Sequence, residues 1–254
     1  MQHGPLRNAY LEALGIDRWV PRHAPVEVPI EPVARAAESL PGAPTTQVVQ
    51  VPVARAALAP HVPLEPGIDW EPLRERVAAC TACELCKTRT QTVFGVGNQR
   101  AEWLVIGEAP GAEEDRQGEP FVGRAGQLLN AMLLAIGLPR ETVFIANILK
   151  CRPPGNRDPR PEEVARCLPF LQAQIALLKP KIMLAVGRIA AQNLLATDAP
   201  LARLRGKLHR FGEAGTPLVI TYHPAYLLRT PSDKRKAWED LKFARAAWQT
   251  LGAN

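Results

Sequence analysis

The sequence predicts an α/β fold built on a mostly parallel sheet. After residue 70, short apolar runs rich in Val and Ile alternate with stretches of helical periodicity. Strands that are apolar along their whole length are typical of parallel sheets covered by helices on both faces. The connections between successive runs are long enough to hold crossover helices, as βαβ units require.

Four apolar runs are the predicted strands: WLVIG at 103–107, VFIANIL at 143–149, KIMLAVG at 181–187 and PLVITYH at 217–223. Helices are expected at 125–136, 161–178, 188–196 and 233–250. Open parallel sheets bind their ligands at the carboxyl ends of the strands. Glu108, Asn147 and His223 lie at or near such ends and are therefore the first candidate site residues.

The region before residue 70 has a different composition. Residues 21–66 contain ten of the 25 prolines and no aromatic residue, which predicts a disordered linker. Residues 7–20 form a short amphipathic stretch, which is either a partner-binding peptide or a helix that packs back on the domain. The expected organisation is a peptide at 1–20, a linker at 21–70 and one domain at 71–254.

Composition restricts the class of partner. The chain has 254 residues, 46% of them hydrophobic, and a formal charge of +6. A basic balance favours polyanionic partners such as nucleic acid. The sequence has no secretory h-region and no run as long as a membrane span, so we expect a soluble cytoplasmic protein without membrane contacts.

The five cysteines favour metal binding over disulfides, because they are odd in number and unevenly clustered. Three follow a C-x2-C-x2-C pattern at Cys80, Cys83 and Cys86, and Cys151 and Cys167 come later. Four thiolates can hold either a tetrahedral zinc ion or a cubane cluster, and the spacing does not separate the two. Five thiols for four positions leave one spare, which can be Cys86 or another of the triplet.

A glycine-rich polar loop, GEAPGAEEDRQGEPFVGRAGQLL, follows the first strand at 107–129. Its glycines allow close approach of backbone to a ligand, but it matches neither a Walker loop nor the dinucleotide spacing. Phe121 within it either packs in the core or stacks on a flat ligand. Asn147, amid apolar neighbours, is either a structural hydrogen-bonder or a reader of a ligand edge.

Two further segments are candidates for contact with DNA. YHPAYLLR, after the fourth strand, contains Leu227, Leu228 and Arg229, which suit a wedge into a base stack but also the first turn of a core helix. Arg205 and Lys207 lie in a short basic loop that either tracks phosphates or is an ordinary surface turn. His223 before Pro224 is either structural or part of the site.

The motifs GEAPG-x-EED, G-x-PFVG-x-AGQLL, N-I-x-K-C-R-P-P and H-P-x-Y-L-L-R occur in this order within a frame of four spaced cysteines. Together they resemble the family 4 uracil-DNA glycosylases of bacteria and archaea. The resemblance covers about residues 75–250 and excludes the first 70 residues.

The resemblance implies a three-layer α/β/α sandwich with a four-stranded parallel sheet. It implies a 4Fe-4S cluster held by Cys80, Cys83, Cys151 and Cys167, with Cys86 spare. Because these cysteines lie outside the GEAPG and His-Pro loops, we expect the cluster to have a structural role. The implied activity is monofunctional removal of uracil from single- or double-stranded DNA, and we expect a monomer.

The resemblance also implies the roles of the site residues. Asn147 would read the uracil edge, Phe121 would stack on the flipped base, and His223 would bind the base oxygen O2. The Leu-Leu-Arg segment would fill the gap in the duplex. These roles suit a reaction that extrudes a base and then stabilises it as a departing anion.

Three positions depart from the better-known uracil glycosylases. Ala109 stands where those enzymes have a water-positioning aspartate, and Gly111 stands where they have a thymine-excluding tyrosine. Our hypothesis is that Glu108 orients the water or its polar network and that Glu114 closes the pocket against a 5-methyl group. Ala225 replaces the serine of their His-Pro-Ser pattern, so a serine contact to phosphate is not available.

The sequence disfavours one related branch, and two alternatives stay open at this point. A related branch that reads GEQPG traps uracil DNA covalently, but Ala109 and the absence of inserted residues between Asn147 and Cys151 favour turnover. A glycosylase of similar scaffold could act on hypoxanthine or another deaminated base. A non-catalytic DNA-binding protein or redox sensor could use the cluster without releasing a base.

Overall fold

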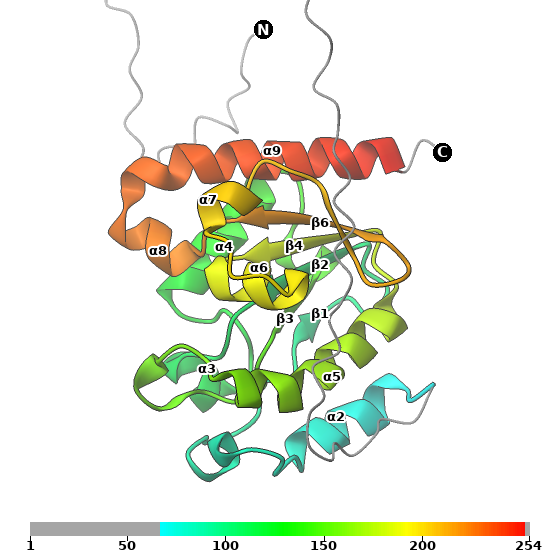
Figure 1. The fold of residues 1–254 in the computed structure, drawn as a ribbon, viewed down its shortest axis with the longest axis vertical. Helices are drawn as coiled ribbons and strands as arrows, with labels where there is room; N and C mark the ends of the chain where they lie inside the picture. The colour runs from blue at the N-terminus through cyan, green and yellow to red at the C-terminus, as the bar shows by residue number, and fades with distance from the viewer. Residues whose placement is uncertain (1–66, 252–254) are drawn as a thin grey trace, which may run out of the picture. The chain divides into compact units, whose positions relative to one another are not determined.

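A single sheet organises the part of the chain that the computed structural model describes, residues 67–251 (Figure 1). Its strand order is β1-β3-β2-β4-β6-β5. The four central strands are parallel: β3 at Phe144–Asn147, β2 at Trp103–Gly107, β4 at Ile182–Val186 and β6 at Thr216–Thr221. The predicted parallel four-stranded centre is therefore confirmed.

Two short antiparallel strands extend the sheet at its edges. They are β1 at Val96–Gly97, which pairs with β3, and β5 at His209–Phe211, which pairs with β6. The sequence analysis missed both, because two or three residues are too few to establish an alternating or a continuous apolar pattern.

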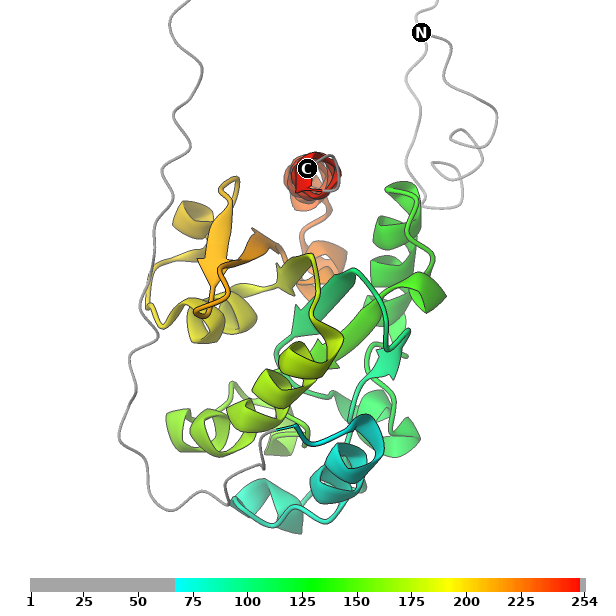
Figure 2. The same ribbon diagram turned by 90° about the vertical axis from the view of Figure 1, so that its right-hand side faces the viewer.

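Helices cover both faces of the sheet, and strand β2 shows how. Leu104 and Ile106 of this strand belong to one buried cluster, whereas Trp103 and Val105 belong to the other. Because successive side chains of a strand point to opposite faces, a strand buried throughout must have a hydrophobic layer on each side. The three-layer α/β/α arrangement follows, and the two views in Figures 1 and 2 show it.

The first face packs against α2 (Trp70–Ala78), α5 (Pro161–Leu178), α6 (Arg188–Leu195) and α7 (Leu201–Leu204). The second packs against α4 (Arg124–Ala135), α8 (Pro224–Arg229) and α9 (Lys234–Leu251). The remaining helix α3 covers Ala112–Gln117, and short 3-10 turns are η1 (Glu84–Lys87), η2 (Arg140–Thr142), η3 (Pro154–Asn156) and η4 (Pro231–Asp233).

The register brings the predicted site residues to one edge of the sheet. Gly107, the last residue of β2, is the partner of Asn147, the last residue of β3. Val186 at the end of β4 is the partner of Thr221 at the end of β6. The loops that follow these strands therefore start side by side, which is where parallel sheets form ligand sites.

The predicted peptide at 1–20 and nearly all of the predicted linker at 21–70 lie outside the described residues. Between residues 67 and 251, none of the helices combines the length and the apolar character needed to cross a membrane.

Candidate functional site

Asn147 ends strand β3 and is 2% exposed. Its side-chain oxygen Oδ1 is buried and has no hydrogen-bond partner. A buried acceptor without a partner destabilises a fold by about 1–3 kcal/mol, so such groups are rare unless a ligand satisfies them. The buried Oδ1 of Asn147 is therefore a candidate to bind a ligand.

Gly107 brings Asn147 and Phe121 together. A Cβ atom at Gly107 would lie 2.4 Å from Oδ1 of Asn147 and 2.7 Å from Cζ of Phe121. Any side chain at this position would push one of the two away. The absence of a side chain thus creates the contact region between the amide and the aromatic ring.

Phe121 also faces His223. The two ring centroids lie 5.7 Å apart with an interplanar angle of 31°. Phe121 is 7% exposed and has a φ of 55°, a left-handed conformation that is unfavourable for a bulky residue. These relations link three residues that were predicted separately. Gly107 lies next to both Asn147 and Phe121, and the Phe121 ring lies next to His223.

His223 is the N-cap of α8, and the structure defines its tautomer. Its Nδ1 accepts a hydrogen bond from the backbone N–H of Ala225 at 3.1 Å, so a neutral ring carries its proton on Nε2. Burial lowers the pKa of His223 to about 4, and the positive charge of Arg229 acts in the same direction. The ring is therefore neutral at pH 7 and offers an Nε2–H donor.

Glu108 follows β2 directly and is partly buried. Burial, together with the negative charge of Asp158, raises the pKa of Glu108 to about 7, although the positive charge of Arg188 opposes this shift. Arg188 and Asp158 form an ion pair at 2.7 Å. The sequence analysis did not select either residue, because they lie 30 positions apart and carry no motif of their own.

The Glu114 carboxylate holds the polar loop together. Its oxygens accept hydrogen bonds from the backbone N–H groups of Gly111 at 3.1 Å, Val122 at 3.0 Å and Gly123 at 3.2 Å. A Cβ at Gly111 would approach Glu114 Oε2 to 2.7 Å. Glu114 therefore shapes the segment that carries Phe121. Ala109 is partly buried and packs against the core cluster on the first face of the sheet.

The segment after β6 differs in part from the prediction. Leu227, predicted as a wedge into DNA, is 1% exposed and packs in the core, because it lies on the inner face of α8. Leu228 is 37% exposed and Arg229 is also at the surface. The exposed part of the predicted wedge is thus Leu228 with Arg229.

Arg205 also differs from the prediction of a phosphate contact. Its Nε donates to Asp240 at 2.7 Å, its Nη2 donates to the backbone oxygen of Lys236 at 2.7 Å, and its guanidinium lies 4.3 Å from the Tyr222 ring centroid. These contacts fix it between β6 and α9. Lys207, by contrast, is exposed.

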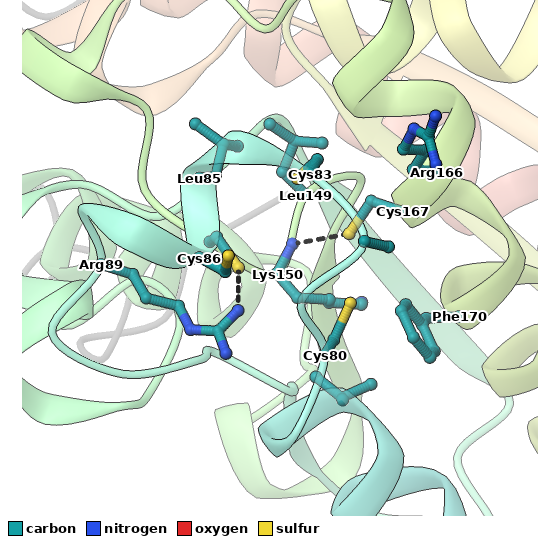
Figure 3. A pocket seen from close by; sticks show the side chains of 13 residues that line it. Cys80, Cys83, Leu85, Cys86, Arg89, Leu149, Lys150, Arg166, Cys167 and Phe170 are labelled. Carbon is teal, nitrogen blue, oxygen red and sulfur yellow. Dashed lines mark hydrogen bonds between the residues drawn. The ribbon is translucent and has the colours of Figure 1, made fainter.

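All five cysteines line one pocket, together with Arg89, Arg166 and Lys150 (Figure 3). Arg89 donates to Sγ of Cys151 at 3.0 Å, and the backbone N–H of Lys150 donates to Sγ of Cys167 at 3.2 Å. Burial raises the pKa of Cys151 to about 11 and that of Cys167 to about 12. In residues 67–251, no three His, Cys, Asp or Glu side chains are arranged so that they could hold one metal ion.

Lys150 connects this thiol pocket with the site at the sheet edge, and the sequence analysis missed it. It is 1% exposed, and its Nζ donates to the backbone oxygen of Asn147 at 2.9 Å and to Oε1 of Gln174 at 2.7 Å. Gln174 in turn donates to the backbone oxygen of Phe94 at 2.9 Å. Lys150 lies in the run NILKC. Its closeness in sequence to Asn147 and Cys151 is the signal that could have identified it.

Comparisons with known proteins agree with this geometry. Residues 94–242 match the family model of the Uracil DNA glycosylase superfamily. The chain is 45% identical over 172 residues to a type-4 uracil-DNA glycosylase of Archaeoglobus fulgidus, covering 65% of this chain and 86% of the relative. It is 43% identical over 180 residues to a type-4 uracil-DNA glycosylase of Thermotoga maritima, covering 69% and 93%.

A type-5 uracil-DNA glycosylase of Thermus thermophilus is more distant, at 32% identity over 153 residues, covering 52% of this chain and 68% of the relative. The matched residues include β2, the loop with Phe121, Asn147 and the His223 segment. The chain belongs to the uracil DNA glycosylase superfamily and, within it, to the type-4 uracil-DNA glycosylases.

Proposed function

We propose that this protein is a monofunctional uracil-DNA glycosylase that hydrolyses the N-glycosidic bond of a flipped uracil and leaves an abasic site for base excision repair. The observation that carries the proposal is the buried, unpartnered Oδ1 of Asn147, which lies beside the Phe121 ring at the carboxyl edge of the sheet. The family to which the chain belongs supports the same reaction.

Asn147 is suited to read uracil. Uracil presents an acceptor at O4 and a donor at N3, and one amide side chain offers a donor and an acceptor that match this pair. Cytosine presents the opposite pattern, so it would leave buried polar groups unpaired. Phe121 offers a flat apolar face on which the extruded base can stack.

His223 is suited to stabilise the leaving group. As the sugar–base bond breaks, negative charge grows on the uracil ring, and a donor aimed at O2 lowers the energy of that state. The neutral ring of His223 has its proton on Nε2 and can donate it in a hydrogen bond. A neutral donor performs this role without a proton being transferred to the base.

Glu108 is our candidate for orienting water near the developing positive charge of the sugar. With a pKa of about 7, an appreciable fraction of Glu108 is ionised at neutral pH and can accept a hydrogen bond from water. Asp158 and Arg188, which form an ion pair, have opposite effects on the pKa of Glu108: Asp158 raises it and Arg188 lowers it. Glu108 and the site residues Ala109 and Gly111 would then form the wall of the pocket next to the sugar.

Glu114 remains our candidate for excluding a 5-methyl group. We propose that it acts indirectly, by holding the loop that carries Phe121. Release of thymine by Glu114→Ala would support this part of the proposal, and strict uracil specificity in that variant would contradict it. Leu228, Arg229 and Lys207 are the exposed residues that we propose contact the DNA, with Leu228 filling the space that the flipped base leaves.

We further propose that the thiol pocket holds a 4Fe-4S cluster through Cys80, Cys83, Cys151 and Cys167. The donor set fits, since each iron atom of a cubane takes one thiolate and the ligands need not converge on one point. Arg89 and the Lys150 amide already donate to two of the sulfurs. When bound, the cluster supplies structural cross-links between the segment entering the sheet, the end of β3 and α5.

The remaining proposals concern the whole chain. We propose a glycosylase domain at 71–254 preceded by a linker, a partner-binding role for residues 7–20, a monomer, and a cytoplasmic location. The basic charge of +6 supports a DNA substrate, single- or double-stranded.

A panel of oligonucleotides tests the proposed function. Anaerobically purified protein of known iron content is incubated with DNA carrying one uracil, hypoxanthine, thymine mismatch or no lesion, followed by alkali. We expect strand breakage at uracil. Breakage at hypoxanthine alone would favour the glycosylase for other deaminated bases, and no breakage by iron-replete protein would favour the sensor.

A further inference from the structure

Phe121 is held in its unusual backbone conformation by its neighbours. Its φ is 55°, which a bulky aromatic residue does not adopt without constraint. The first turn of α4 lies very close to the peptide group of Phe121. A Cβ atom at Gly126 would lie only 1.8 Å from the Phe121 carbonyl oxygen. A glycine at this position is what lets the helix approach the loop so closely.

Arg140, in the turn η2, binds the same loop from outside. Its Nη2 donates to the backbone oxygen of Pro120 at 2.6 Å and to Oε1 of Glu119 at 2.9 Å. Its Nη1 donates to Oδ1 of Asn130 at 3.0 Å and to the backbone oxygen of Phe121 at 3.4 Å. One guanidinium therefore fixes the two successive carbonyl groups that precede and follow the Cα of Phe121.

The Glu114 carboxylate fixes the next peptide groups. It accepts hydrogen bonds from the N–H groups of Val122 and Gly123. Arg140 thus binds carbonyl oxygens up to Phe121, and Glu114 binds the N–H groups that come after it. The backbone on each side of Phe121 has its polar groups committed to a charged side chain, which gives the ring a defined direction.

That direction is the one the site requires. The ring lies between the neighbourhood of Asn147, through Gly107, and the imidazole of His223. We propose that Arg140 is a positioning residue that orients Phe121 for stacking on the flipped base; this inference rests on the proposed function. Arg140 itself does not touch the base: three of its acceptors belong to the loop residues Glu119, Pro120 and Phe121, and Asn130 on α4 is the fourth.

The guanidinium is the required chemical group. Its planar fork reaches several acceptors in fixed directions, whereas the ammonium of lysine is a point charge that cannot span them in the same geometry. Arg140→Lys should therefore keep the charge and lose the orientation. Arg116, which pairs with Glu113 at 2.6 Å on α3, serves as the comparison arginine, because its side chain forms an ion pair outside the Phe121 loop.

The test is a double-mutant cycle on the full, iron-replete chain. Wild type, Arg140→Met, Phe121→Leu and the double variant are compared by single-turnover uracil release and by inhibition with free uracil, and thermal unfolding is measured for each. Arg116→Met is the control. Inhibition by free uracil depends on the base pocket alone. A structural change elsewhere in the protein would leave the inhibition constant unchanged.

We expect Arg140→Met to weaken uracil inhibition about tenfold, the scale of one lost base–aromatic stacking contact, and to slow release similarly. In the Phe121→Leu background the same change should add less than about twofold, because residues that act as one unit are not additive. Arg116→Met should leave both quantities unchanged.

An equal loss in both backgrounds, or unchanged uracil inhibition in Arg140→Met, would overturn the proposal. If Arg140→Met does not fold, Arg140→Lys takes its place in the same cycle and the same outcomes decide. If wild type releases uracil and Arg140→Met matches it in release and in uracil inhibition, only this inference is contradicted. If wild type releases no uracil, the proposed function itself is contradicted.

Discussion

The backbone N–H of Ala225 donates a hydrogen bond to Nδ1 of His223 at 3.1 Å. The side chain at position 225 is a methyl group and has no polar role, but its amide determines which nitrogen of the imidazole carries the proton. Together with a pKa lowered to about 4 by burial, this contact makes His223 a neutral Nε2–H donor across the physiological pH range.

The rate of uracil release should depend on pH through Glu108 rather than His223. Because burial raises the pKa of Glu108 to about 7 and lowers that of His223 to about 4, the single-turnover rate should rise with pH through about 7 and then level off. Glu108→Gln should be slower and have a flat profile between pH 5 and pH 8. A variant that keeps the wild-type profile would exclude Glu108 as the titrating group.

Glu108 should also make the protein less stable as the pH rises. Its pKa is raised from 4.5 to about 7 on folding, so the folded state holds the proton more tightly than the unfolded state. The associated stability is complete below the unfolded pKa and is lost as the pH rises through the folded pKa. Glu108→Gln should therefore raise the melting temperature more at pH 8 than at pH 5.

The control for this prediction is Glu75→Gln, which changes an exposed glutamate on α2. Its melting temperature should follow wild type at both pH values. An identical response of the two variants would mean that burial of Glu108 does not affect stability.

Cys151 and Cys86 should respond differently to replacement, although both line the same pocket. Cys151→Ala removes a proposed ligand, so the iron content and the unfolding midpoint should fall together, and activity should fall because of the lost stability. Cys86→Ala should change neither quantity. A stable, iron-replete but inactive Cys151→Ala protein, or iron loss from Cys86→Ala, would contradict the proposed ligand set.

Leu227 and Leu228 are adjacent in sequence, but replacing them should change different properties. Replacement of Leu227 should lower stability, and replacement of Leu228 should slow uracil release. Leu227 is 1% exposed, and Leu227→Ala should cost about 2–5 kcal/mol of stability, as other buried leucines do. Leu228 is 37% exposed, and Leu228→Ala should change stability by less than about 0.5 kcal/mol. It should instead slow uracil release from duplex DNA more than from single-stranded DNA.

Equal activity of Leu228→Ala on the two substrates would argue against a role in filling the duplex. Thermal unfolding and single-turnover assays on matched oligonucleotides measure both effects.

The sequence was sufficient to predict the central sheet, because each of its strands is a continuous apolar run with a helix after it. Local context made Asn147, Phe121 and His223 candidates with a structural alternative for each, and their proposed roles came from the resemblance to the family 4 glycosylases. Their mutual arrangement could not be predicted, because it depends on Gly107 and on the pairing of β2 with β3. The strand ends were also inexact: the run predicted at 143–149 forms a strand at Phe144–Asn147, and the run predicted at 217–223 forms one at Thr216–Thr221.

Residues that act at a distance were harder to find. Arg140 contacts groups 19 to 21 positions earlier in the chain, and no local pattern distinguishes it from a surface arginine. Leu227 and Leu228 look equivalent in sequence, because the short helix α8 that separates their environments has no periodic pattern to reveal it. Arg205 looked like a loop cation because its partner Asp240 lies 35 positions away.

We propose that the side-chain amide of Asn147, whose buried Oδ1 has no partner, reads uracil, and single-turnover release of free uracil from a duplex with one uracil tests this proposal. We expect wild type to release uracil in proportion to the DNA supplied and Asn147→Ala to be at least about 100-fold slower, because the hydrogen bonds that select the base are lost. The variant should keep its iron and its melting temperature. Release at the wild-type rate by Asn147→Ala, or no release by iron-replete wild-type protein, would contradict the account.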